Sequence, residues 1–158
     1  MHNNTLDTKT RNLILLLFLI GVFMGSLDTG IIGPVLPSIE QSFQLTSRES
    51  SWIFTLFVIF FMIGSPIMAK FSDFYGRKKI FLLDVILFGI GSCLIAFSFN
   101  MESIFLGRII QGFGCGGLFP VAGAFVGDAF PLEERGKALG ILGSVFGISA
   151  IGGPLVGA

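Results

Sequence analysis

The sequence predicts an all-α, polytopic membrane protein with about five transmembrane helices. Hydrophobic residues make up 53% of the 158 residues and charged residues only 13%, and the mean hydropathy is +0.87. A soluble domain of this length needs more polar surface than that. Residues 50–69 contain no Asp, Glu, Lys or Arg, and neither does the stretch between Asp84 and Glu102. Because about 20 helical residues cross the ~30 Å hydrocarbon layer, each stretch is long enough to span a membrane.

The first two elements follow from the charges that flank them. We expect residues 1–12 to form a tail and residues 13–33 to form the first span, an apolar run interrupted by Asp28. Gly33-Pro34 and Pro37 are expected to break its outer end, because proline removes a backbone donor. The second span, residues 51–69, ends at a cationic turn that runs from Ala69 to Lys79.

The remaining three spans are predicted at residues 80–99, 103–127 and 138–158. The connection between the third and fourth is so short that these two must form an antiparallel hairpin. The fifth is rich in glycine, and we expect a bend near Pro154. No linker or soluble domain interrupts the array.

The basic residues fix the expected orientation. The loops between these spans place eight of them on one side of the membrane and only Arg48 on the other; the eight are Lys9, Arg11, Lys70, Arg77, Lys78, Lys79, Arg135 and Lys137. The positive-inside rule then predicts a multi-pass protein of the cell membrane with a cytoplasmic N-terminus. The tenth cation, Arg108, falls inside the fourth span.

Composition also excludes several classes of function. The net charge is zero and there is no basic tail, so nucleic acid is not an expected partner. The two cysteines lie in spans without a nearby histidine, so no metal site is expected. His2 is the single histidine and no Ser/His/Asp set exists, which argues against an enzyme. The pattern G-x-G-x-x-G at Gly112, Gly114 and Gly117 lies within an apolar span, where it cannot meet a dinucleotide.

Pairs of glycines four residues apart predict close helix packing in lipid. The pairs are Gly21/Gly25, Gly112/Gly116, Gly123/Gly127, Gly143/Gly147 and Gly153/Gly157.

Two charges inside the spans are candidates for chemistry. Counting along the helices places Asp28 and Arg108 both roughly 7 Å below the outer edge of the hydrocarbon. An unpaired charge there would cost several kcal/mol, so we expect the two to share one polar cavity. The pair could be a static contact that pins two helices, or it could couple protons or a cationic substrate to movement. Gln111, in the next turn, is expected to be a hydrogen-bonding partner inside the bundle, either between helices or to substrate.

The cationic turn contains a second candidate set. Gly76 permits a tight reversal, Asp73 lies near the start of the next helix, and Arg77 can reach an acid on a neighbouring loop, for which Asp128 is the expected partner. Lys78 adds to the charge. The alternative is a solvated cluster that only sets topology. Asp84 is expected to reach the interface or to pair with Lys79 or Lys78.

These residues resemble the motifs of the major facilitator superfamily from about Asn12 onward. Asp73, Gly76, Arg77 and Lys78 resemble the loop motif between its second and third spans, with Ala69 and Phe74 off pattern. Leu27-Asp28-Thr29 and Leu36-Pro37 resemble the motif of the first span. Arg108, Gln111 and Gly112 resemble the motif of the fourth span. Gly140, Gly153, Pro154 and Gly157 resemble the motif of the fifth span.

The resemblance implies a proton-driven antiporter that exports drugs or other amphipathic molecules. Proton coupling and substrate binding would then involve Asp28, Arg108 and Gln111. A gating loop would be formed by Asp73, Gly76, Arg77, Lys78 and Asp128. The glycines and the proline of the fifth span would form an antiporter helix. No cofactor is implied, because the proton gradient supplies the energy. The expected partners are the lipid bilayer, a small-molecule substrate and protons.

Members of the superfamily are built from two six-span halves. We therefore expect the chain to be the five-span N-terminal portion of a transporter whose remaining helices are its further partner. Two alternatives stay open: a symporter for sugar or another metabolite, and a small membrane scaffold if the five-span chain is complete.

Overall fold

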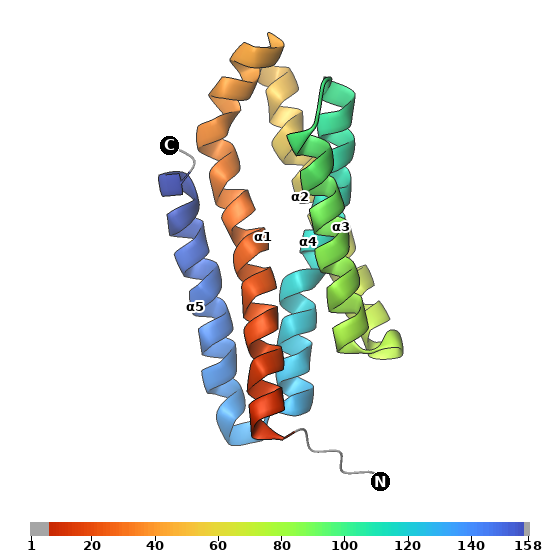
Figure 1. The fold of residues 1–158 in the computed structure, drawn as a ribbon, viewed down its shortest axis with the longest axis vertical. Coiled ribbons are helices and arrows are strands. Elements are labelled where there is room, and N and C mark those ends of the chain that lie inside the picture. The colour runs from red at the N-terminus through yellow and green to blue at the C-terminus, as the bar shows by residue number, and fades with distance from the viewer. Residues whose placement is uncertain (1–6, 157–158) are drawn as a thin grey trace.

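The computed structural model describes residues 7–156, apart from the side chains of Ala150 and Val156. Every regular element in that range is a helix, and the fold is the predicted all-α bundle (Figure 1). The helices are α1 (Thr8–Phe43), α2 (Ser47–Tyr75), α3 (Arg77–Ala96), α4 (Met101–Ala129) and α5 (Leu132–Val156). All five are long and apolar enough to cross a membrane.

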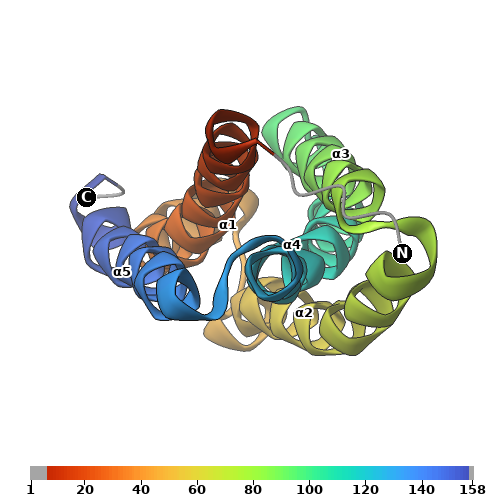
Figure 2. The same ribbon diagram turned by 90° about the horizontal axis from the view of Figure 1, so that it is seen from below.

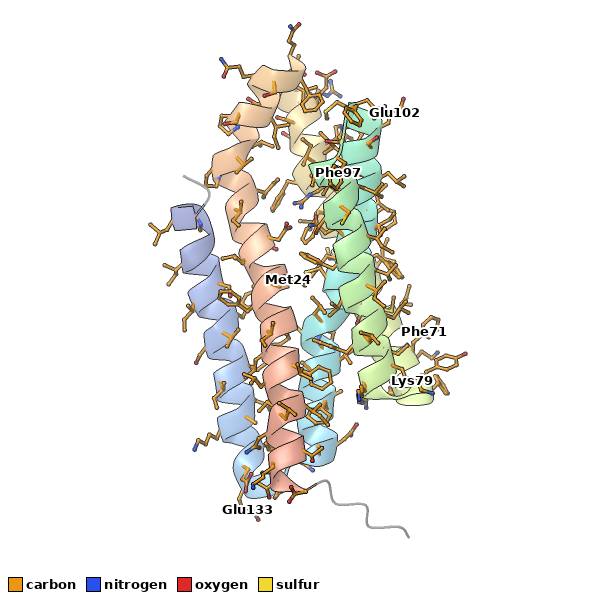
Figure 3. The ribbon with its side chains drawn as sticks, viewed as in Figure 1. Met24, Phe71, Lys79, Phe97, Glu102 and Glu133 are labelled. Atoms are coloured by element: carbon orange, nitrogen blue, oxygen red, sulfur yellow. The ribbon has the colours of Figure 1, made fainter. Side chains whose placement is uncertain are left out.

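The bundle has two ends, which the antiparallel helices define. At the lower end in Figure 1, α1, α3 and α5 begin and α2 and α4 end. The side chains of Lys79 and Glu133 lie toward this end, whereas Glu102 lies at the upper end (Figure 3). The predicted sorting of the basic residues between two faces therefore agrees with the course of the chain.

Helix α4 contacts each of the other helices and is the most buried of the five in the described bundle. Seen from the lower end, it lies at the centre, with α1 and α5 side by side on one flank and α2 and α3 on the other (Figure 2). Its buried core residues include Leu118, Val121, Ala122 and Val126.

The prolines of α1 do not break it, contrary to the prediction. The helix continues through Pro34 and Pro37 to Phe43. The residues four positions before the prolines, whose carbonyls each ring crowds, are Gly30 and Gly33. Glycine has no side chain to hold the local backbone in one geometry, which lets those carbonyls tilt away. Helix α5 likewise continues through Pro154.

The helix boundaries also differ from the predicted spans. Helix α2 begins four residues before and ends six residues after its predicted span, and α5 begins six residues early. The predicted turn of residues 69–79 is therefore helical except at Gly76.

Further differences occur at the start of α1 and at both ends of α3. Residues 8–12 of the expected tail are helical. Helix α3 begins at Arg77 and ends at Ala96, about three residues earlier than predicted. The cause is Gly76, whose φ of 95° reverses the chain so tightly that α3 starts at the next residue. Asn100 accepts a hydrogen bond from the Ser103 amide and so fixes the start of α4.

Glycines of α4 bring neighbouring backbones into contact. A Cβ added at Gly112 would overlap the carbonyl oxygen of Phe57, and one at Gly116 would overlap that of Phe61, both on α2. The predicted packing role therefore holds for this pair. Nothing lies within 4 Å of a Cβ at Gly123, Gly127, Gly143 or Gly147 in the described part of the chain, so two of the predicted pairs make no such contact.

We predict that Gly112→Ala lowers the stability of the full-length protein by about 1–3 kcal/mol, because the added methyl group must push α2 away. The matched control, Gly123→Ala, should be neutral or slightly stabilising, because alanine is the better helix former. Thermal unfolding of both purified variants in detergent measures the difference. Equal effects of the two substitutions would contradict this packing.

Candidate functional site

The buried guanidinium of Arg108 is the centre of a polar cluster inside the bundle. Its side chain is only 2% exposed. Nη1 donates to Asp28 Oδ2 at 2.9 Å and to Gln111 Oε1 at 2.6 Å, and Nε donates to the backbone carbonyl of Ile53 at 3.1 Å. The expected pairing of Arg108 with Asp28 is thus formed, and it includes the ion pair that a buried charge needs.

Gln111 joins the same cluster to α3. Its Nε2 donates to Asp28 Oδ1 at 2.9 Å and to Ser92 Oγ at 2.9 Å, and Ser92 Oγ donates to the carbonyl of Phe88. Groups from α1, α2, α3 and α4 therefore meet at one place. Glycine permits this convergence, because a Cβ at Gly91 would lie 2.6 Å from both the backbone nitrogen of Gln111 and the backbone carbonyl oxygen of Gly107.

The cluster is shielded on one side and open on another. The Arg108 guanidinium carbon lies 4.4 Å from the centroid of the Phe57 ring, an attractive cation–π arrangement. In contrast, the Asp28 side chain is 27% exposed. Among the described residues, Arg108 Nη2 has no hydrogen-bond partner. The carboxylate can therefore be reached from outside the packed core while the guanidinium cannot, and one donor stays free for another acceptor.

An apolar cavity of about 300 Å³ lies beside this cluster. The Phe57 side chain lies against Arg108 of the cluster and also lines the cavity. Helices α1, α2, α4 and α5 supply the wall, which consists of Val22, Gly25, Ser26, Thr29, Phe57, Val58, Phe61, Met62, Cys115, Leu118, Phe119 and Phe146. The two hydroxyl groups in it donate to their own helix, Ser26 to Val22 and Thr29 to Gly25. The wall therefore offers aromatic and aliphatic surface next to a charged carboxylate.

The turn between α2 and α3 forms a second cluster around Arg77. Its Nε donates to Asp128 Oδ2 at 2.8 Å, Nη1 donates to Ser72 Oγ at 2.6 Å, and Nη1 also pairs with Asp73. The expected contact between Arg77 and Asp128 is therefore present, and it ties the turn to the lower end of α4. Lys78 is exposed and has no ion pair in the described structure.

Comparison with known proteins decides the family. A family profile described as Major Facilitator Superfamily matches residues 18–158. The chain belongs to this superfamily. It is thus part of a family of transporters rather than of enzymes, as the sequence predicted.

Similar members of the superfamily differ in what their names say they transport. The chain is 42% identical to an uncharacterized MFS-type transporter, YfiU, of Bacillus subtilis over 96% of its length, and 36% identical to multidrug resistance protein 3 of the same organism over all of it. It is 32% identical to the riboflavin transporter RibZ of Clostridioides difficile over 94% of its length. The alignments cover 29%, 31% and 33% of these relatives, so the chain spans about a third of their length.

Among the predicted residues of the fifth span, Gly153 makes a close contact with another helix. A Cβ there would lie 2.5 Å from Gly30 Cα, so α1 and α5 cross at these two glycines, and Pro154 packs against the same place. Gly140 is exposed, and nothing lies within 4 Å of a Cβ added to it. Gly157 lies outside the described residues.

Asp84 is not where the sequence predicted. It is fully buried, and neither of its carboxyl oxygens has a hydrogen-bond partner among the described residues. Lys78 and Lys79 are exposed on a different face of α3, because six and five residues correspond to about 120° and about 140° of rotation around a helix. The expected pairing with either lysine is therefore wrong, and Asp84 faces α4 instead.

Sequence reasoning missed several members of these clusters. Ser92, Phe57 and Ser72 were not singled out. A separate ion pair was also missed, that of Arg11 with Glu134, whose Nη2 and Oε2 atoms are 2.5 Å apart. Ser92 had a signal: it lies four and eight residues after Phe88 and Asp84, on one face of α3. The carbonyl of Ile53 has no signal of this kind, because a backbone group carries none in the sequence.

We predict that Arg108→Leu lowers the stability of the full-length protein by about 3–5 kcal/mol, because it leaves Asp28 without its counter-ion. The double variant Arg108→Leu/Asp28→Leu should lose less than this single variant. Thermal unfolding of wild type, both single variants and the double variant gives the coupling free energy. Strictly additive losses would show that the pair does not contribute as a pair.

Proposed function

We propose that the full-length protein is a proton-coupled antiporter that exports drugs or other amphipathic organic molecules. The observation that supports this most strongly is the position of the Asp28–Arg108–Gln111 cluster beside an apolar, aromatic cavity. A membrane-embedded carboxylate that is partly accessible can bind a proton, and the adjoining surface can bind a hydrophobic molecule.

Coupling would follow from competition at Asp28. The ionised carboxylate accepts hydrogen bonds from Arg108 and Gln111 and would attract a cationic substrate in the cavity, whose apolar wall would bind the lipophilic groups of that substrate. Protonation removes the negative charge, weakens the link to Arg108 and so lowers the affinity for a cation. A proton that enters from outside would therefore favour release of the substrate, and loss of the proton inside would favour its binding.

The chemistry of the cavity favours amphipathic substrates over polar ones. Hydrocarbon and aromatic groups dominate its wall, and the hydroxyl groups of Ser26 and Thr29 are already bonded to the backbone. A volume of about 300 Å³ is at the small end for a ligand site. The rest of the wall would come from the remainder of the transporter, since the aligned relatives are about three times as long.

The lower end of the bundle is proposed to face the cytoplasm in the cell membrane, because it holds most of the loop cations. There, the ion pairs of Arg77 with Asp73 and Asp128 would act as a gate that opens and closes with the helices. The glycine crossing of Gly30 and Gly153 would let α5 move against α1. The proton gradient is the energy source, and no cofactor is needed.

The name of multidrug resistance protein 3 supports export as the direction of transport. The riboflavin transporter among the relatives supports a second candidate, proton-linked uptake of a metabolite. The two candidates differ in the direction in which a pH gradient drives the substrate.

We predict that the full-length protein in inverted vesicles accumulates ethidium, a fluorescent lipophilic cation, when the vesicle interior is acidic, and that Asp28→Asn abolishes the response to the gradient. Glu133→Gln, which neutralises an exposed carboxylate of α5, is the matched control and should behave as wild type. Vesicles with Asp28→Asn that accumulate ethidium at the wild-type rate would rule out this coupling site. Ethidium movement that ignores the gradient in wild type would rule out proton-driven export.

A further inference from the structure

Asp84 lies in the seam between α3 and α4, where glycines make room for it. It has no exposed surface. A Cβ at Gly117 would overlap the Asp84 carboxyl group, and one at Gly114 would lie 2.6 Å from the Asp84 carbonyl oxygen. The carboxyl group therefore fills the space that a side chain at Gly117 would take.

No charged group in the described structure forms an ion pair with this carboxyl group. Both of its oxygens lack a hydrogen-bond partner. Arg108 is already paired with Asp28, and the cations at the lower end of α1 and at the α2–α3 turn, Arg11 and Arg77, are paired with Glu134, Asp73 and Asp128.

The surroundings of Asp84 determine whether its carboxyl group is ionised or neutral while α3 and α4 are in close contact. An ionised carboxylate without a donor or a counter-ion would cost several kcal/mol inside a membrane-embedded bundle. The neutral acid costs far less, and it fits the same space. Close contact between α3 and α4 therefore favours the protonated form of the Asp84 carboxyl group.

The position of Asp84 relates it to the polar cluster above it. Asp84, Phe88 and Ser92 lie on one face of α3, and Ser92 accepts a hydrogen bond from Gln111, which in turn donates to Asp28. Eight residues separate Asp84 from Ser92, a rise of about 12 Å toward the lower end. A second carboxyl group therefore lies along the same seam, between the cluster and the end where α3 begins.

We propose that Asp84 is a second proton-binding site of this segment. It holds a proton while α3 and α4 are in close contact and exchanges it with water at the lower end when the seam loosens. The step is a simple acid dissociation, in which the carboxyl O–H bond breaks, the proton passes to water and a carboxylate remains. Its role in transport rests on the proton coupling proposed above, whereas proton binding itself does not.

Infrared spectroscopy of the full-length protein in lipid tests proton binding without any substrate. Wild type should show a carbonyl stretching band of a protonated carboxyl group that shifts in D2O and disappears at alkaline pH. Asp84→Asn, which keeps the size of the side chain, should lack this band, and the control Asp28→Asn should retain it. A band that survives in Asp84→Asn, or one that neither exchanges nor titrates, would overturn the proposal.

If Asp84→Asn fails to accumulate, Asp84→Ala/Gly117→Ala replaces it, because the new methyl group at residue 117 fills the space of the lost carboxyl group. In vesicles, either variant should reduce the stimulation of ethidium transport by a pH gradient at least tenfold. Unchanged stimulation would overturn the role in transport. Loss of stimulation only in Asp28→Asn would leave the proposed function intact and remove Asp84 from it.

Discussion

A guanidinium group in the interior of a membrane-embedded bundle needs a counter-ion and hydrogen-bond acceptors, and Arg108 imposes this requirement on the helices around it. Asp28 supplies the counter-charge from α1, Ile53 a backbone carbonyl from α2, and Gln111 a second acceptor from α4 itself. Each partner belongs to a different part of the chain, so satisfying one charge sets the positions of three helices. The glycine contacts of α4 with α2 and α3 are what allow those helices to come close enough.

The same requirement links the structure to the proposed transport. A cluster that depends on one ion pair is sensitive to a single proton, because protonation of Asp28 would change the balance of charge around Arg108. The bundle packs α4 closely against α2 and α3, while α5 lies along α1 and crosses it at Gly30 and Gly153. The hydrogen bonds of Asp28 on α1 to Arg108 and Gln111 on α4 join these two groups of helices, so they are the polar contacts that a relative movement of the groups would change. The Arg77 pairs lie within the group of α2, α3 and α4.

Much of this arrangement could be predicted from the sequence, for identifiable reasons. Long charge-free stretches with short loops leave few ways to order five helices, and matched depth was enough to pair Asp28 with Arg108. The position of Asp84 could not be predicted, because it depends on the rotation of α3, which contacts such as that between Gly91 and Gly107 determine. The continuity of α1 through its prolines was also missed, since a local rule for proline ignores the glycines that precede them.

The most direct test of the account asks whether substrate and proton exclude one another at Asp28. Full-length protein in detergent, in weakly buffered solution with a pH indicator dye, would be mixed with ethidium. The account predicts that wild type releases protons as the cation binds and that Asp28→Asn binds without such release. No release from wild type on binding, or equal release from Asp28→Asn, would contradict it.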